Sequence, residues 1–146
     1  MKKKVLFVCI HNSARSQIAE ALLQKYGKDQ FEVLSAGFEP QEINPLAIEA
    51  LLKDEGIDIS KNSVNSVFNY YKEGKLFNYV ITVCDAGAAQ KCPLFPGLLH
   101  SRIHWSFEDP NLFTGTHEEK LNKMIAVKNQ IKNEVLKFIE EVEKKR

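Results

Sequence analysis

Two residues that can do chemistry, Cys9 and Arg15, stand six positions apart within the stretch VLFVCIHNSARSQIAE. An apolar strand is predicted before Cys9 and a helix after the loop, and the first turn of such a helix favours an anion. The same field lowers the pKa of a cysteine thiol, whose thiolate is the attacking form. The planar guanidinium of Arg15 is suited to two oxygens of a tetrahedral oxyanion. The sequence therefore predicts a nucleophile inside an oxyanion-binding loop made of Ile10, His11, Asn12, Ser13, Ala14, Arg15 and Ser16.

The other polar residues of this loop have supporting roles in the same hypothesis. Ser13 or Ser16 is expected to donate its hydroxyl to the Cys9 sulfur, and Asn12 to hold the loop by bonding its own backbone. The alternative is a buried, inert cysteine at a strand end with a solvated arginine nearby. The combination of apolar strand, small polar loop, following helix and serine after the arginine favours the reactive interpretation.

Strand-like and helix-like segments alternate along the rest of the chain. Apolar and β-branched runs predict strands at residues 4–9, 31–37, 77–84 and, as a short one, 102–105. Apolar spacing predicts helices at 16–26, within 44–56, within 66–77 and at 117–143. Gly27 is expected to close the first of these helices. In the second, Asn44 is expected as the N-cap, Pro45 as the first helical residue and Gly56 just past the end. In the last and longest helix, only Lys128 interrupts the apolar stripe. This order predicts an α/β fold with a four-stranded parallel sheet, helices on both faces, and ligands at the carboxyl ends of the strands.

The composition is that of a globular protein with no bulk attraction to polyanions. The 146 residues have room for one compact domain, taken as 1–146, with 44% hydrophobic and 27% charged residues and a formal net charge of +1. That charge gives no reason to expect nucleic acid as a partner, and the apolar runs are too short to cross a membrane. Without a recognisable export signal, we expect a cytoplasmic protein that acts as a monomer. Its three cysteines are then expected to be free thiols.

The second and third cysteines extend the thiol chemistry of the loop. Cys84 ends the predicted strand 77–84, so in a parallel sheet it emerges at the same edge as Cys9. If the two strands are adjacent, they lie about 4.8 Å apart. The segment 85–91 is predicted to form a short helix, which would hold the Cα atoms of Cys84 and Cys92 roughly 12 Å apart. A disulfide tolerates only about 7 Å, so that pair requires the segment to unwind. From the residues alone, Cys84 as a buried strand-end residue and Cys92 as an incidental loop thiol remain alternatives.

The stretch CIHNSARS resembles the active-site loop of low-molecular-weight protein tyrosine phosphatases and of the arsenate reductases that share their fold. RSQIAEALL, with Gln17 after Ser16, is more similar to the reductase branch. His11 stands where many relatives have glycine, and Ala14 where many have a second loop cysteine. The resemblance continues through SAG (35–37), NPLAIEAL, IDIS, VITVCD, CPLFPG and HWSFEDP. It implies the phosphatase-like version of the predicted α/β fold.

Resemblance to the thioredoxin-coupled reductases implies an order of thiol reactions. In that family a first cysteine attacks arsenate, a second attacks the first and releases arsenite, and a third captures the second as a disulfide that thioredoxin reduces. Cys9, Cys84 and Cys92 match these roles in order, with a glutaredoxin as the alternative reductant. Asp109, in Asp-Pro, matches the general acid of the family in preference to Glu108. The sequence NLF after this motif, where the phosphatases have tyrosines, argues for a small inorganic substrate.

The resemblance leaves a cofactor and two other functions open. Some reductase relatives bind a potassium ion through residues that match Asn12, Glu20, Ser35, Ser63 and Asn65. His100 and His104 are not accompanied by further ligands for a transition metal, so none is expected. A low-molecular-weight phosphatase would need Cys9, Arg15 and Asp109 but neither other cysteine. An oxyanion-binding or redox-sensing module without turnover is the remaining alternative.

Overall fold

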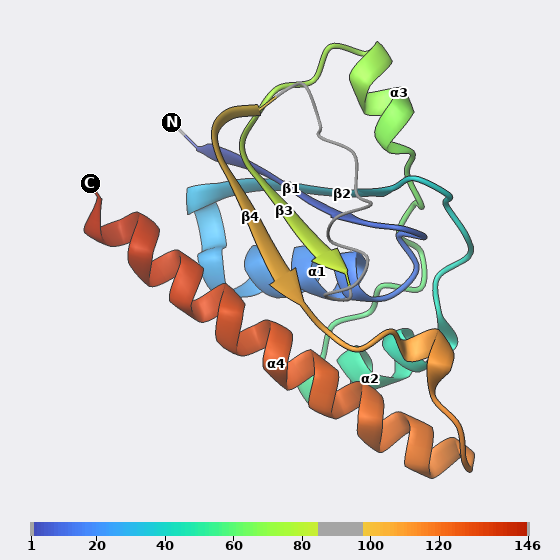
Figure 1. The fold of residues 1–146 in the computed structure, drawn as a ribbon. Helices are drawn as coiled ribbons and strands as arrows, with labels where there is room; N and C mark the ends of the chain where they lie inside the picture. The colour runs from blue at the N-terminus through green and yellow to red at the C-terminus, as the bar shows by residue number, and fades with distance from the viewer. Residues whose placement is uncertain (1, 85–97, 146) are drawn as a thin grey trace.

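Four parallel strands form one twisted sheet, as the sequence predicts (Figure 1). The computed structural model describes residues 2–84 and 98–145 of the chain. The strand order is β2-β1-β3-β4, with every neighbouring pair parallel. The strands are β1 (Lys3–Cys9), β2 (Phe31–Gly37), β3 (Phe77–Cys84) and β4 (Leu98–Ser106).

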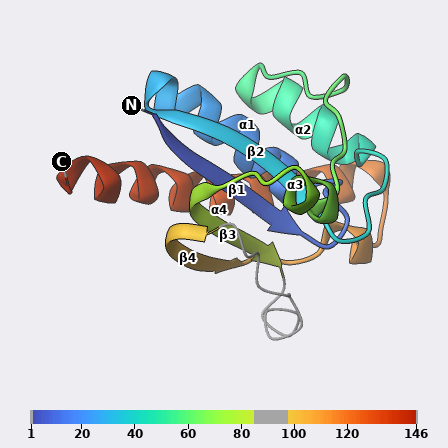
Figure 2. The same ribbon diagram turned by 90° about the horizontal axis from the view of Figure 1, so that it is seen from above.

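Helices cover both faces of this sheet. The helices are α1 (Arg15–Gly27), α2 (Pro45–Glu55), α3 (Val67–Lys72) and α4 (His117–Lys144). On one face, Val5 and Phe7 of β1 pack in a core with apolar residues of α1, α2 and α4. On the other, Leu6 and Val8 pack with residues of α3. Figure 1 shows α1, α2 and α4 together on the first face with α3 apart from them, and in Figure 2 the long α4 extends across the molecule.

The fourth strand is longer than the short run 102–105 predicted for it. β4 spans Leu98–Ser106 and lies at the edge of the sheet. At this edge, Trp105 is buried whereas Arg102 and His104 are exposed. The added residues 98–101 read LLHS, two apolar and then two polar, so they show neither a long apolar run nor the alternation that predicts a strand.

The ends of α2 follow the predicted capping pattern. The Asn44 side chain accepts a hydrogen bond from the Leu46 amide at 2.8 Å, Pro45 occupies the first turn, and Gly56 adopts a left-handed conformation with φ of 69°. Capping by Asn and a left-handed Gly each satisfy backbone groups that the helix leaves unpaired. This fixes where the segment before α2 meets the loop after β1.

Gly27 differs from the role expected of it. It still belongs to α1 with φ of −83°, and Lys28 is the residue with positive φ, at 52°. A Cβ on Gly27 would lie 2.6 Å from the Phe31 ring. Glycine is therefore needed here for the close approach of Phe31, not for a left-handed helix end.

The carboxyl ends of β1 and β3 lie side by side, as predicted. Val8 is the ladder partner of Thr82, and Cys84 follows two residues later at the end of β3. The backbone of Cys84 is thus at the same edge as Cys9. Cys92 and the predicted helix 85–91 lie outside the described residues.

Candidate active site

The loop between β1 and α1 turns its peptide carbonyls outward. Each carbonyl from residue 10 to 13 accepts a hydrogen bond from outside the loop: Ile10 from the Glu39 amide at 2.7 Å, His11 from the Gln41 amide at 2.9 Å, Asn12 from Gln17 Nε2 at 3.2 Å, and Ser13 from the Asn44 amide at 2.8 Å. In a planar trans peptide, the carbonyl and the next N–H point in opposite directions. The amides of residues 11 to 14 are therefore directed inward, toward Cys9, which makes the loop a concave anion site.

Asn12 is the turning point of this loop. Its φ is 54°, a left-handed value that asparagine tolerates better than most residues. Its amide donates to Cys9 Sγ at 3.0 Å, and its side-chain Oδ1 accepts from the Asn65 amide at 3.0 Å. Asn12 therefore ties the thiol to the loop and the loop to the segment before α3.

Of the two candidate serines, Ser16 contacts the sulfur of Cys9. Ser16 Oγ lies 3.0 Å from Cys9 Sγ and accepts from Asn12 Nδ2 at 2.6 Å. Because that bond uses a lone pair of the hydroxyl, the Ser16 proton is free to point at the sulfur. Cys9 is 3% exposed, so the Asn12 amide and the Ser16 hydroxyl, and not water, are the hydrogen-bond partners of its sulfur. Ser13 serves the loop through its carbonyl instead.

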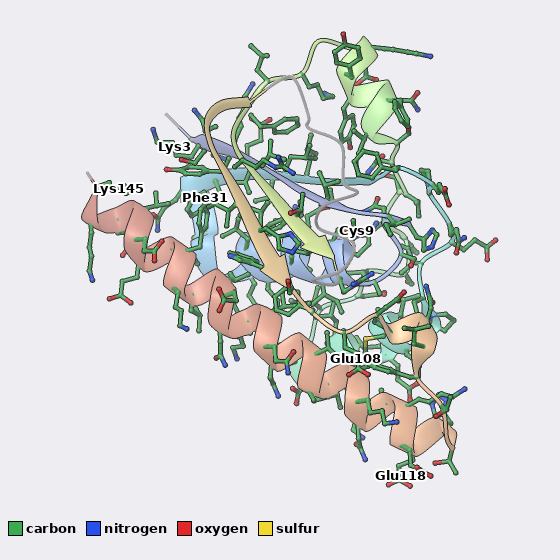
Figure 3. The ribbon with its side chains drawn as sticks, in the orientation of Figure 1. Lys3, Cys9, Phe31, Glu108, Glu118 and Lys145 are labelled. Atoms are coloured by element: carbon green, nitrogen blue, oxygen red, sulfur yellow. The ribbon has the colours of Figure 1, made fainter. Side chains whose placement is uncertain are left out.

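Arg15 is held beside the loop by the segment that follows β4. Its guanidinium is buried and donates from one terminal nitrogen to the Phe107 carbonyl at 3.1 Å. The other terminal nitrogen lies 3.8 Å from Asp109 Oδ1. Figure 3 shows Cys9 at the end of β1 and Glu108 on the segment between β4 and α4. Of the two predicted acids, Asp109 is thus at the site, whereas Glu108 is exposed.

Asp109 also begins the short 3₁₀ helix Pro110–Leu112, where its Oδ1 accepts from the Asn111 amide at 2.9 Å. This is the Asp-Pro turn that the motif alone predicts. The turn fixes the carboxyl group on the side of the loop where Arg15 lies. The geometry combines a buried sulfur, inward amides, a guanidinium and a carboxyl group, a set suited to attack on a tetrahedral oxyanion.

The whole described chain also matches one family. The model of the low molecular weight phosphotyrosine protein phosphatase family matches residues 4–146. The chain belongs to this family. This confirms the resemblance seen in CIHNSARS and in the motifs that follow it.

Within this family, the chain is similar to arsenate reductases. It is 38% identical over 139 residues to the arsenate reductase of Shouchella clausii, covering 95% of this chain and 96% of that protein. A solved arsenate reductase in the phosphate binding state superposes with a TM-score of 0.77 at 30% identity, over 95% of this chain and 98% of that one. A thioredoxin-dependent arsenate reductase of Corynebacterium glutamicum gives a TM-score of 0.70 at 28% identity, over 99% of this chain and 63% of that one.

Two further residues, which the sequence did not predict, support the loop of Cys9. The fully buried Gln17 side chain donates to the Ser63 carbonyl at 3.0 Å as well as to Asn12. A Cβ on Gly37 would lie 2.8 Å from both the Asn12 nitrogen and the Ile10 oxygen, so only glycine lets β2 end against the loop. The sequence signals were Gln17 after Ser16, which resembles the reductase branch without indicating these contacts, and a glycine at a strand end.

The five residues expected around a potassium ion are brought together beside the loop. Ser35 Oγ donates to Glu20, Asn65 Nδ2 donates to the Ser35 carbonyl at 3.2 Å, and Ser63 Oγ donates to Asn65 Oδ1 at 3.1 Å. Asn12 joins the group through the Asn65 amide. Burial raises the pKa of Glu20 above its ordinary value, although hydrogen bonds from Ser35 and Gln24 oppose this.

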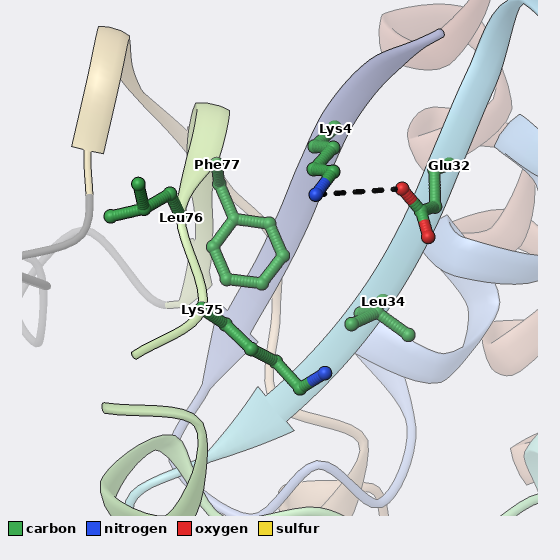
Figure 4. A pocket seen from close by; sticks show the side chains of 6 residues that line it. All are labelled: Lys4, Glu32, Leu34, Lys75, Leu76 and Phe77. Carbon is green, nitrogen blue, oxygen red and sulfur yellow. Dashed lines mark ion pairs between the residues drawn. The ribbon is translucent and has the colours of Figure 1, made fainter. Parts of the chain in front are cut away.

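Other parts of the described chain add no metal centre to this site. Residues 2–84 and 98–145 contain no group of three His, Cys, Asp or Glu side chains placed to hold a metal ion. Within the same residues, no helix has both the length and the apolar character needed to span a bilayer. A pocket of about 60 Å³ lined by Lys4, Glu32, Leu34, Lys75, Leu76 and Phe77 lies at the amino ends of the strands, opposite to Cys9 (Figure 4).

Proposed function

We propose that this protein is an arsenate reductase that uses Cys9 as its nucleophile. The observation that carries the proposal is the Cys9 sulfur, held by the Asn12 amide and the Ser16 hydroxyl within a loop that Arg15 flanks. This arrangement occurs in a chain 38% identical to an arsenate reductase over nearly its whole length. Reduction of arsenate would make the protein part of cellular arsenic detoxification.

The first step is attack of the Cys9 thiolate on arsenic. A bond forms between sulfur and arsenic, an As–OH bond breaks, and the departing hydroxide takes the proton of Asp109 and leaves as water. The inward amides and the Arg15 guanidinium hold the remaining oxygens, whose negative charge grows as the transition state forms. The 3.8 Å between Arg15 and Asp109 supports this assignment, since both groups reach the same side of the loop.

The second step is the reduction itself, with Cys84 as the second nucleophile. The Cys84 thiolate attacks Cys9 Sγ, the sulfur–arsenic bond breaks, and its electron pair stays on arsenic, which leaves as arsenite. The two thiols have then become a disulfide. Cys92 next attacks Cys84, which frees the Cys9 thiolate and leaves a Cys84–Cys92 disulfide.

An external dithiol completes the cycle. Its two thiols reduce the Cys84–Cys92 disulfide, so that one arsenate and one dithiol give arsenite, water and one disulfide. Thioredoxin is the proposed dithiol, supported by the similarity to a thioredoxin-dependent reductase, with a glutaredoxin as the alternative. A relay that starts from reduced thiols suits the reducing cytoplasm, where we propose that the protein acts.

Hydrolysis of phosphate monoesters is the second candidate function. It requires Cys9, Arg15 and Asp109, and it is supported by the 3.8 Å contact of Arg15 with Asp109 and by the family model, which is named for phosphotyrosine phosphatases. Phosphorus in the cysteine–phosphate intermediate is not reduced by attack of a second thiol, so water must complete that reaction. Neither Cys84 nor Cys92 is needed.

Single cysteine variants distinguish the two functions. We expect Cys84→Ser and Cys92→Ser each to abolish arsenate-dependent NADPH oxidation in the presence of thioredoxin and its reductase, while hydrolysis of p-nitrophenyl phosphate persists. Cys9→Ser, the matched control, should abolish both activities. If arsenate turnover survives in Cys84→Ser and Cys92→Ser, the proposed relay is wrong; if no variant or parent reduces arsenate, the phosphatase assignment remains.

We further propose that a potassium ion binds beside the loop, held by Asn12, Glu20, Ser35, Ser63 and Asn65. Oxygen atoms suit such a hard cation, and a positive charge would offset the burial that raises the pKa of Glu20. Potassium chloride should therefore raise the melting temperature more than tetramethylammonium chloride at equal ionic strength, and Glu20→Gln should remove the difference. Equal melting temperatures in the two salts would contradict this site.

A further inference from the structure

Gln17 is a buried polar side chain to which the proposed chemistry gives no role. It lies in the first turn of α1, with 1% of its surface exposed. Its Nε2 donates to the Ser63 carbonyl at 3.0 Å and to the Asn12 carbonyl at 3.2 Å, and its Oε1 accepts from Asn62 Nδ2 at 3.3 Å. Because carbonyl oxygens only accept hydrogen bonds, these partners fix which end of the amide is the donor.

The Asn12 carbonyl is held differently from the other carbonyls of the loop. Those of Ile10, His11 and Ser13 accept from backbone amides of the segment before α2. The Asn12 carbonyl accepts from the Gln17 side chain instead. At this peptide a single side chain, and so a single substitution, controls the direction of a carbonyl of the loop.

The two peptide groups on either side of Asn12 have different partners. In the peptide before it, the His11 carbonyl accepts from a backbone amide, and the Asn12 N–H donates to Cys9 Sγ. In the peptide after it, the carbonyl accepts from Gln17, and the Ser13 N–H is directed inward. The first peptide thus provides a donor to the sulfur, and the second provides a donor to the anion.

The Asn12 side chain has partners of its own besides Gln17. Its Oδ1 accepts from the Asn65 amide at 3.0 Å, closer than Gln17 Nε2 at 3.4 Å, and its Nδ2 donates to Ser16 Oγ at 2.6 Å. Loss of the Gln17 amide therefore leaves this side chain bonded to a backbone amide and to the Ser16 hydroxyl. The Cys9 sulfur keeps both of its hydrogen-bond partners.

We propose that Gln17 is a positioning residue for oxyanion binding, which keeps the Ser13 amide directed at the anion through the Asn12 carbonyl. The inference rests on the proposed function, in which this loop binds a tetrahedral oxyanion. Asn12 is 0% exposed, so without the Gln17 donor its carbonyl is left buried with a hydrogen bond lost, and the peptide is no longer fixed in this direction. A donor that must reorient contributes less to anion binding than one already in place.

Gln17→Met tests the proposal, because methionine is similar in size and has no hydrogen-bond donor. We expect its dissociation constant for inorganic phosphate, measured by calorimetry, to rise about tenfold, since a hydrogen bond to a charged group is lost. In a Cys84→Ser/Cys92→Ser background, Cys9 is the one remaining cysteine. Its alkylation by iodoacetamide, a neutral reagent that needs no anion site, should keep the rate of the parent. General loosening of the loop would change both measurements.

Two further variants complete the test. Gln30→Met removes another glutamine hydrogen bond, from Nε2 to Glu143 Oε1 at 3.1 Å, just before β2 and so at the opposite edge of the sheet from the loop. It is the matched control and should leave phosphate affinity unchanged. Asn62→Ala removes, from an exposed position, the donor that orients the Gln17 amide, and should weaken phosphate binding about threefold.

The measurements distinguish failure of this inference from failure of the proposed function. A folded Gln17→Met protein with the phosphate affinity of the parent would overturn the inference, as would an equal loss of its alkylation rate. If Gln17→Met does not fold, parental affinity in Asn62→Ala would overturn it. A parent that binds no phosphate would overturn both this inference and the oxyanion site. Failure to reduce arsenate is seen separately in NADPH oxidation, and a tenfold loss of phosphate affinity in Gln17→Met supports the inference even then.

Discussion

At the scale of single residues, the reactivity of Cys9 depends on a serine whose proton is directed by an asparagine. Ser16→Ala removes the hydroxyl and leaves the Asn12 amide as the remaining donor to the sulfur. We expect p-nitrophenyl phosphate hydrolysis near neutral pH to fall by about tenfold, because a hydrogen bond to the charged sulfur is lost. Initial rates of this hydrolysis, compared between the parent and the variant, test the prediction.

Ser13→Ala is the control for this prediction, because Ser13 meets its neighbours through a backbone carbonyl that the substitution keeps. Its rate of p-nitrophenyl phosphate hydrolysis should equal that of the parent. A Ser16→Ala variant with an unchanged rate would mean that the Asn12 amide and the helix end are sufficient to hold the attacking sulfur.

The residues that could be predicted are those whose chemistry is local. Cys9, Arg15 and Ser16 lie within eight residues, so their types and spacing indicate a function without knowledge of the fold. Gln17 and Gly37 could not be predicted in this way. Their roles depend on contacts with segments at residues 63 and 10–12, which only the folded chain brings to them.

At the scale of elements, α4 is attached to α2 by a buried ionic cluster. Lys128, 1% exposed, contacts Asp54 and lies 2.6 Å from Glu55 Oε2, with Lys132 at 3.2 Å from the same oxygen. The other Glu55 oxygen accepts from Lys25 at 3.0 Å and from Tyr26 at 2.6 Å. The residue that interrupts the apolar stripe is thus the one that fixes where α4 crosses α2.

Removal of the Glu55 charge should destabilise the protein, most of all near neutral pH. Burial by itself raises the pKa of Glu55, but hydrogen bonds from Lys128, Tyr26, Lys25 and Lys132 outweigh it and hold the pKa well below its ordinary value of 4.5. The stabilisation is therefore complete above about pH 4.5 and is lost as the pH falls toward the lower, folded-state pKa. Glu55→Gln should cost about 3 kcal/mol at pH 7, because it leaves Lys128 with one carboxylate.

Urea denaturation at pH 7 and pH 4 tests this, since the difference between parent and Glu55→Gln should shrink at the lower pH. Glu140→Gln is the matched control: it breaks the exposed pair of Glu140 with Lys144 at 3.2 Å and should cost less than about 0.5 kcal/mol. A Glu55→Gln penalty as small as that of Glu140→Gln would show that α4 is held by its apolar stripe alone.

Element boundaries could be predicted where the pattern is strong in the sequence itself. The capped α2 and the apolar β1 and β3 agree closely with prediction, because their signals are capping residues and continuous apolar runs. The extent of β4 was underestimated, since its first residues, LLHS, show neither a long apolar run nor a period of two. The register that sets Cys84 beside Ser106 had no sequence signal, because it depends on how two distant strands pair.

At the scale of the whole molecule, three distant segments meet at one loop. The segment before α2 binds the carbonyls of residues 10, 11 and 13, residues 63 and 65 bond to Gln17 and Asn12, and the segment after β4 holds Arg15. An anion in the loop would therefore be bound by the folded state alone. Ligands of this kind stabilise the fold by mass action, with about 2.7 kcal/mol at one hundred times the dissociation constant.

Arsenate or phosphate at that concentration should raise the melting temperature by several degrees beyond sodium chloride of equal ionic strength. Arg15→Lys keeps the positive charge but loses the fork that bonds both the Phe107 carbonyl and the anion, so most of this increase should disappear. Arg102→Lys, at an exposed arginine of β4, should retain the full increase. If the anion raises the melting temperatures of Arg15→Lys and Arg102→Lys equally, then it binds elsewhere and the loop of Cys9 is not an oxyanion site. If only Arg15→Lys loses this rise in melting temperature, the three segments that converge on the loop are coupled to its ligand.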